Sequence, residues 1–157
     1  MIGYCDADWA NSKDRRSITG YVFMLADTGS LISWKFRKQS TVALSTCEAE
    51  YMSMCAAVQE AKFLMQLLND MTKGITNKSV ILNVDNQSAI ELSKNPAFHQ
   101  ISKHIDIKYH FIRSEVEMFH PTCFIFHLKI TLPKMFTKSL STIKLKLFTS
   151  AIMNVSQ

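Results

Sequence analysis

The sequence predicts a single mixed α/β domain whose first three strands are antiparallel. Its 157 residues have the length of one domain, and 47% hydrophobic with 20% charged residues is ordinary globular composition. Short runs rich in β-branched and aromatic residues come first, and long segments with apolar residues at helical spacing follow. Adjacent extended segments followed by alternating helices and strands are typical of a mixed sheet covered by helices.

Three extended segments, separated by turns, predict the antiparallel half. The first covers residues 3–9, and a polar, turn-like stretch follows it at residues 11–17. The second covers residues 19–26 and the third residues 31–36. Asp-Thr-Gly-Ser at residues 27–30 is typical of the turn in a β-hairpin.

A long helix is predicted over residues 46–71. Ser45 or Thr46 suits its N-cap, and Glu48 lies in the first turn, beside the positive end of the helix dipole. Gly74 is expected to end it. One helical face is marked by apolar residues spaced three and four apart: Met54, Ala57, Ala61, Leu64 and Leu68.

The remaining half of the chain alternates strands and helices. An apolar run before Asp85 predicts a buried strand, and Pro96 limits the short helix that follows. We expect these elements: a strand at 79–84, helices at 86–93 and 105–119, a strand at 122–130 and a helix at 133–148.

Charge and hydropathy exclude several classes of protein. The net charge is +5, which suits a polyanionic partner. No apolar run approaches the ~20 residues of a membrane span, and the start, MIGYCDADWA, lacks the apolar core of a signal peptide. We therefore expect no membrane association, an intracellular location and reduced cysteines.

Three acids are placed where this layout puts strand ends or helix starts: Asp6, Glu48 and Asp85. A carboxylate at the end of a central strand usually faces a crevice in an α/β sheet. Converging carboxylates repel one another unless a cation lies among them, and oxygen ligands favour magnesium. Each acid also has an ordinary explanation. Asp6 could be a solvated acid on an edge strand, Glu48 could interact with the helix dipole, and Asp85 could be an N-cap.

Longer segments of the sequence are more specific than these three single acids. Over residues 3–117, about three quarters of the chain, the sequence resembles the ribonuclease H domain of copia-type LTR retrotransposon Pol polyproteins. The words that carry the resemblance are GYCDADWA, RRSITGYVFMLADTGSLISWKFRKQSTVALSTCEAEYMSM, VDNQSAIELSKNPAFH and SKHIDIKYHFIRSEVE.

The resemblance implies a ribonuclease H-like fold, with a five-stranded mixed sheet flanked by helices, in a single domain over residues 1–157. It implies Mg²⁺-dependent endonucleolytic hydrolysis of the RNA strand of RNA–DNA hybrids, with two ions. It also implies a C-terminal Pol fragment with a reverse transcriptase domain of the parent polyprotein as a partner. The cytoplasm or the nucleus is the implied location.

The family's catalytic and metal-binding carboxylates match Asp6 in D-A-D-W-A, Glu48 in C-E-A-E-Y and Asp85 in D-N-Q-S-A. Asp8 and Glu50 belong to the same words but match no catalytic position. On this comparison they are supporting or surface residues.

Nucleic-acid contacts are expected from two segments. Asn86 and Gln87 follow Asp85 and suit the shallow minor groove or the 2′-hydroxyl groups of a hybrid. Lys35, Arg37 and Lys38 alternate with aromatic residues and suit a phosphate backbone. The alternatives are an N-cap at the first segment and the solvated charges of an edge strand at the second.

The resemblance degenerates after residue 117. The family's fourth carboxylate lies in an L-A-D-I-F-T-K word, and this chain has Lys134 at that position. Residues 118–157 carry five lysines and no carboxylate, so no neighbouring acid replaces it. The loss predicts impaired hydrolysis. The alternative function is a catalytically inactive nucleic-acid-binding or structural remnant.

Overall fold

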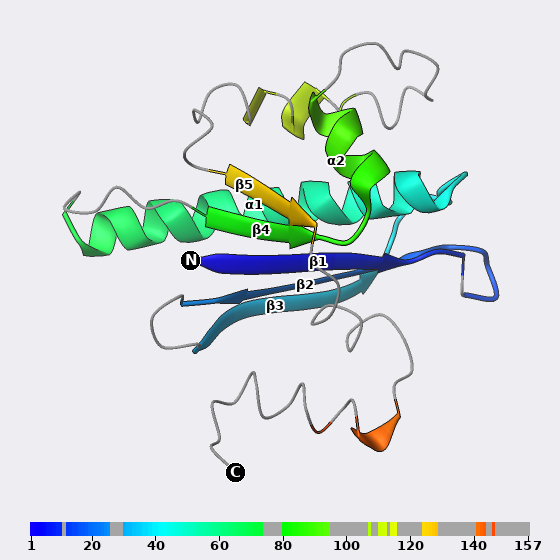
Figure 1. Ribbon diagram of the computed structural model, residues 1–157, viewed down its shortest axis with the longest axis horizontal. Helices are drawn as coiled ribbons and strands as arrows, with labels where there is room; N and C mark the ends of the chain where they lie inside the picture. The colour runs from blue at the N-terminus through cyan, green and yellow to red at the C-terminus, as the bar shows by residue number, and fades with distance from the viewer. Residues whose placement is uncertain are drawn as a thin grey trace.

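The computed structural model describes residues 1–10, 12–25, 30–73, 80–94, 107, 110–112, 114–115, 124–128, 141–143 and 146. Their strands and longer helices, in chain order (Figure 1), are β1 (Ile2–Asp8), β2 (Ile18–Met24), β3 (Leu31–Lys38), α1 (Thr46–Met71), β4 (Val80–Val84), α2 (Gln87–Lys94) and β5 (Phe124–Leu128). None of the helices in these ranges is long and apolar enough to cross a membrane.

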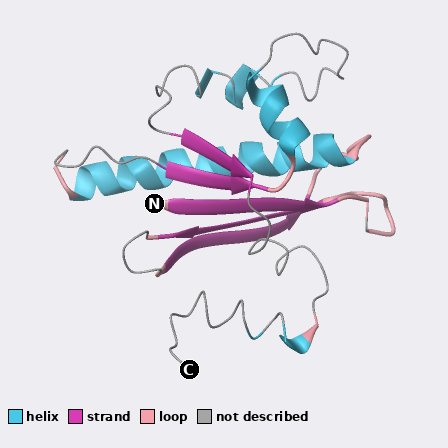
Figure 2. Cartoon of the chain, viewed as in Figure 1, coloured by secondary structure: helices cyan, strands magenta, loops and turns pink. Residues whose placement is uncertain are grey.

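The strands form one mixed sheet in the order β3-β2-β1-β4-β5 (Figure 2). β2 lies antiparallel to both β1 and β3, whereas β4 lies parallel to both β1 and β5. The antiparallel arrangement of the first three strands is therefore as predicted. β1 is central, and its two neighbours run in opposite directions.

Helix α1 packs along one face of the sheet, against β1 and β2 (Figure 1). Four of the five residues that predicted its apolar face, Met54, Ala57, Ala61 and Leu64, are buried. The sheet side of this core includes Cys5, Tyr21, Phe23, Leu82 and Val84. The rings of Tyr21 and Phe23 meet edge to face, with centroids 5.8 Å apart.

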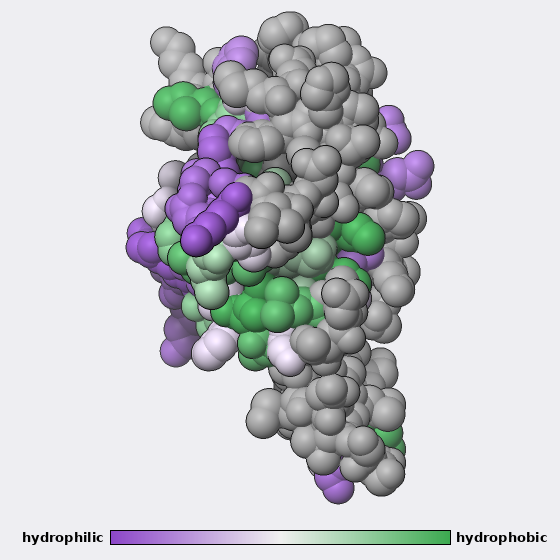
Figure 3. Space-filling model, turned by 90° about the vertical axis from the view of Figure 1, so that its left-hand side faces the viewer, coloured by the Kyte–Doolittle hydropathy of each residue, from purple (hydrophilic) through white to green (hydrophobic). Residues whose placement is uncertain are grey.

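The opposite sheet face carries a smaller apolar cluster. Tyr4, Val22 and Met24 are buried there, with Ile2 and Leu31 packed against them. Side chains alternate along a strand, so Tyr4 and Cys5 point to opposite faces. From the side on which β1 begins, a hydrophobic area is visible among hydrophilic side chains (Figure 3).

Both ends of α1 are capped. Ser45 is the N-cap, and its Oγ accepts a hydrogen bond from the Glu48 backbone N–H at 3.1 Å. The C-cap is Thr72, whose backbone N–H donates to the carbonyl of Leu68. The helix spans the predicted residues, whereas Gly74, its predicted end, lies outside the described residues.

Several bounds differ from those predicted. β3 extends to Lys38 because the chain stays bonded to the start of β2, where the Gln39 N–H donates to the carbonyl of Ser17 at 2.8 Å. Of the predicted helix 105–119, the six described residues are helical. Most of the predicted helix 133–148 lies outside the described residues, as do three residues of the predicted hairpin turn.

Candidate active site

The sheet topology brings Asp6 and Asp85 together. The parallel register of β1 and β4 ends at the pair Cys5 and Val84, and the two acids are the next residue on each chain segment. The strand order of the sheet, β3-β2-β1-β4-β5, reverses between β1 and β4. Ligand crevices in α/β sheets lie outside the carboxyl ends of strands at such a switch.

Glu50 on α1 is the third carboxylate. Asp6, Glu50 and Asp85 each offer an oxygen within 4.8 Å of the others. The Glu50 Oε2 accepts a hydrogen bond from the Ala7 backbone N–H at 3.1 Å, which fixes the carboxylate against β1. Asp6 and Glu50 are buried and Asp85 is half-buried.

A buried serine fastens α1 to the same part of the sheet. The Ser53 hydroxyl lies 2.7 Å from the Asp6 carbonyl oxygen and 3.3 Å from the Gly20 carbonyl oxygen, so it donates to β1 or to β2. Ser53 lies three residues after Glu50, on the same side of the helix. The glutamate is therefore positioned by contacts of α1 with two strands.

The structure does not bring Glu48 into this cluster. Its Oε2 accepts a hydrogen bond from the Leu44 backbone N–H at 2.8 Å, and its own N–H bonds to Ser45. This pattern resembles a capping box, except that the glutamate accepts from the residue before the N-cap Ser45 and not from the N-cap itself. Residues two apart on a helix point ~200° apart, so Glu48 and Glu50 face different directions.

The structure thus places the other glutamate of the C-E-A-E-Y word, Glu50, in the cluster, and the catalytic role predicted for Glu48 stays a prediction. Two signals distinguish the glutamates. Glu50 lies four residues before Met54 and so continues the apolar face toward the sheet. Glu48 lies three residues after Ser45, the spacing of a capping box. Asp8 is buried, but it is not part of the cluster.

The negative charge of the cluster affects the pKa of the buried Cys5 thiol. Burial raises the pKa of Cys5 well above its ordinary value, and the nearby charges of Glu50, Asp6 and Asp85 raise it further. The thiol therefore stays protonated and is a poor nucleophile.

Three buried or half-buried carboxylates at this separation form a donor set that fits a hard divalent cation such as Mg²⁺.

The residues after Asp85 begin α2. The Asn86 Oδ1 accepts a hydrogen bond from the Ala89 backbone N–H at 3.1 Å, the contact of an N-cap. The Gln87 side chain is exposed at the first position of the helix. Both predicted binding residues thus adjoin the cluster, and Gln87 is the more accessible.

The other predicted site residues lie elsewhere. Lys35, Arg37 and Lys38 are exposed on β3, and they line a pocket between this strand and α1. Trp9, which sequence reasoning did not select, follows β1 with 45% of its surface exposed, and its indole N–H donates to the Ala43 carbonyl at 3.1 Å. Lys134 lies outside the described residues.

Known proteins that are similar to most of this chain are retrovirus-related Pol polyproteins of transposons. No family model matches. Over 118 residues, 74% of the chain, the sequence is 44% identical to the retrovirus-related Pol polyprotein from transposon TNT 1-94 of Nicotiana tabacum. It is 41% identical over the same share to the Pol polyprotein from transposon RE1 of Arabidopsis thaliana. The chain spans only 9% and 8% of the length of these two polyproteins.

Solved structures of similar fold are ribonuclease H domains. The N-terminal RNase H domain of a Mycobacterium tuberculosis protein matches with a TM-score of 0.55 and 11% identity, over 87% of this chain and 93% of that one. LC11-RNase H1 in complex with an RNA/DNA hybrid matches with a TM-score of 0.54 and 13% identity, over 98% of this chain and 96% of that one. The chain therefore has a ribonuclease H-like fold, and its homologues are retrovirus-related Pol polyproteins of plant transposons.

Proposed function

We propose that this chain is the ribonuclease H domain of a copia-type retrotransposon and that it cuts the RNA strand of RNA–DNA hybrids endonucleolytically. The observation that carries the proposal is the convergence of Asp6, Glu50 and Asp85 within 4.8 Å at the switch point of the sheet. The fold supports it, since one structure of similar fold is in complex with an RNA/DNA hybrid.

The three carboxylates would hold magnesium, with Glu50 in the role that the sequence assigned to Glu48. Bound magnesium ions would activate a water and stabilise the leaving oxygen of the phosphodiester. The chain's own contribution is rigidity, because Ala7 and Ser53 fix the glutamate and the backbone of Asp6. The exposed Gln87 would contact the hybrid's minor groove, where the 2′-hydroxyls of the RNA lie.

The setting of this activity is part of the proposal. The chain would act as a C-terminal part of a Pol polyprotein, beside its reverse transcriptase domain, in the cytoplasm or the nucleus. A second candidate is a folded but inactive remnant that still binds nucleic acid. The observation that favours it is Lys134, a cation at the position of the family's fourth carboxylate.

Cleavage of a hybrid with labelled RNA in Mg²⁺ tests the proposal. We expect the native chain to cut and Asp85→Asn to cut at least about 100-fold more slowly, because losing ~3 kcal/mol of transition-state stabilisation has that effect. Circular dichroism checks that the variant is folded. A folded native chain that binds the hybrid but never cuts it contradicts the activity and supports the remnant.

Lys134→Asp is expected to raise the cleavage rate at least about tenfold. The substitution changes the local charge by two units, and one pair of unit charges ~5 Å apart is worth ~3 kcal/mol at an effective dielectric of ~20. Lys138→Asp, which makes the same charge change four residues later, is the matched control. Equal rates for the two variants would mean that Lys134 does not lie at the site.

A further inference from the structure

The outer edge of β3 is open to solvent. β3 is the last strand on the antiparallel side of the sheet, and no strand of the described part of the chain lies beyond it. Its second half, residues 34–38, is exposed at every position. An edge strand of this kind offers a row of unpaired N–H and C=O groups to a further strand.

The hydrogen bonds between β3 and β2 identify the outward backbone groups. The Gln39 N–H donates to the Ser17 carbonyl at 2.8 Å, so these two residues form a hydrogen-bonded pair. In an antiparallel ladder, such pairs alternate with pairs whose backbone groups point away from each other. Counting back from residue 39, the odd-numbered residues of β3 bond to β2 as far as the irregularity near its start. The even-numbered residues direct their N–H and C=O groups outward: Trp34, Phe36 and Lys38.

The side chains of this edge differ between the two faces of the sheet, because they alternate along the strand. Lys35 and Arg37 lie on the α1 face, where they line the basic pocket between β3 and α1, and the described residues of that lining include no carboxylate. Trp34 and Phe36 lie on the opposite face, with 61% and 56% of their surfaces exposed. Trp34 is opposite Val22 in the register, so it extends the smaller apolar cluster of that face.

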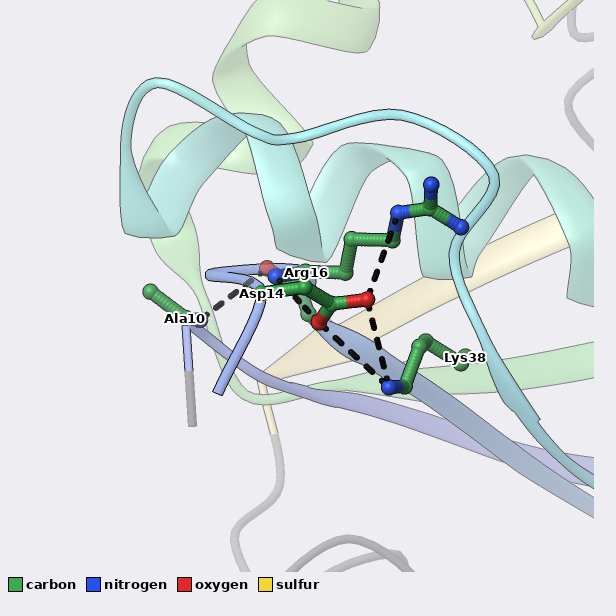
Figure 4. A network of polar contacts seen from close by, with 5 residues as sticks. Ala10, Asp14, Arg16 and Lys38 are labelled. Atoms are coloured by element: carbon green, nitrogen blue, oxygen red, sulfur yellow. Dashed lines mark hydrogen bonds and ion pairs between the residues drawn. The ribbon is translucent and has the colours of Figure 1, made fainter. Parts of the chain in front are cut away.

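Lys38 contributes less to the free positive charge of the edge. Its ammonium lies 3.3 Å from the Asp14 carboxylate, which also lies 3.6 Å from the Arg16 guanidinium (Figure 4). The charge that a further strand would meet on the α1 face therefore comes chiefly from Lys35 and Arg37.

This pattern disfavours one occupant of the edge and favours another. If β3 paired with β3 of a second copy, lysine and arginine would face cations, and like charges directly opposite each other destabilise a sheet. Charged residues on an edge commonly serve to prevent such pairing. That role does not explain two exposed aromatic side chains on the other face, which are typical of surfaces that bind other proteins. The edge is thus unsuited to its own copy and suited to a strand of opposite charge.

We propose that the β3 edge binds an extended segment of a partner protein in which acidic residues alternate with apolar ones. Its acidic side chains face Lys35 and Arg37, and its apolar side chains pack on Trp34 and Phe36. Cross-strand pairs of opposite charge and of aromatic with β-branched residues stabilise a sheet, and the outward backbone groups supply the main-chain bonds. This binding goes beyond hybrid cleavage and does not depend on it, since no residue of β3 belongs to the carboxylate cluster.

Two short synthetic peptides test the charge preference of the full chain. One alternates glutamate with valine and the other lysine with valine, and anisotropy of a fluorescent label measures binding. We expect the native chain to bind the acidic peptide and not the basic one. Joint Lys35→Glu and Arg37→Glu should weaken the acidic peptide at least about tenfold and allow the basic peptide to bind, because each cross-strand charge pair changes sign. Joint Lys73→Glu and Lys146→Glu, at exposed lysines outside β3, makes the same change in net charge and should keep the native preference.

The aromatic face has its own matched pair of variants. Trp34→Ala is expected to weaken the acidic peptide at least about fivefold, because the peptide's apolar side chains lose their partner. Phe63→Ala is the control, since Phe63 is also 61% exposed but lies on α1. Circular dichroism checks that both variants are folded. An equal effect of the two variants would contradict docking on β3.

Amide hydrogen exchange distinguishes an added strand from contact by side chains alone. Saturating acidic peptide should slow exchange at least about tenfold at Trp34, Phe36 and Lys38, and change it little at Lys35 and Arg37, which already bond to β2. Binding without this alternation overturns the proposal, as does the absence of binding. If neither peptide binds and the joint reversal on β3 instead weakens binding of an RNA–DNA hybrid, the edge serves nucleic acid and the proposal is wrong.

Discussion

Glu50→Gln is expected to slow hybrid cleavage at least about 100-fold, whereas Glu48→Gln keeps most of the activity. Of these two glutamates, Glu50 is the one whose carboxylate lies with Asp6 and Asp85. Neutralising it removes the charge of one proposed metal ligand and leaves the size of the side chain nearly unchanged. Single-turnover cleavage at saturating Mg²⁺ measures the difference between the two variants.

Glu48→Gln is the control for Glu50→Gln, because both variants make the same substitution on the same helix. Glutamine also serves at the third position of a capping box, so Glu48→Gln preserves the bond to Leu44 and changes stability little. Thermal unfolding checks that both variants are folded to the same extent. Loss of cleavage in Glu48→Gln together with retention in Glu50→Gln would return the catalytic role to Glu48.

Asp6→Asn is expected to raise the melting temperature of the metal-free protein by about 3–8 °C while abolishing cleavage. Asp6 is fully buried beside two other carboxylates. Two like charges ~5 Å apart repel by ~3 kcal/mol at an effective dielectric of ~20, and part of this is relieved when one charge is removed. For a domain of this length, ~1 kcal/mol corresponds to about 2–4 °C.

A titration with Mg²⁺ gives the second half of this test. The native protein should be stabilised as the ion binds, because binding to the folded state alone adds to its stability. Asp6→Asn should lose most of that increase. Glu91→Gln, on the exposed side of α2, is the control, with an expected change within about 0.5 kcal/mol in either condition. A lower melting temperature for metal-free Asp6→Asn would show that repulsion does not dominate the site.

Local patterns predicted the elements because the chain is regular within each of them. α1 begins and ends at the predicted residues, since its apolar residues recur every three or four positions and Ser45 caps it. The ends of the strands differ from the predicted ends by one or two residues, because a strand ends where its hydrogen bonds to the neighbouring strand end. β3 shows this, as Ser17, distant in sequence, prolongs it.

The site was predictable only in part. Asp6 and Asp85 follow from strand order, because adjacent parallel strands bring their carboxyl ends together. The choice between Glu48 and Glu50 required the direction of each side chain around α1. The basic pocket also required the placement of α1 against β3, which no local pattern contains.

The bond from Ser53 to the β1 backbone has a consequence for how the site forms during synthesis. β1, β2, β3 and α1 are consecutive in the chain and pack on one another, so they can fold together before the later part of the chain is synthesised. Asp6 and Glu50 both belong to this first unit, whereas Asp85 arrives only when β4 adds beside β1. A ribosome-bound chain that ends before Asp85 would therefore hold two carboxylates in place without the third, and the proposed activity would begin only when the fourth strand docks.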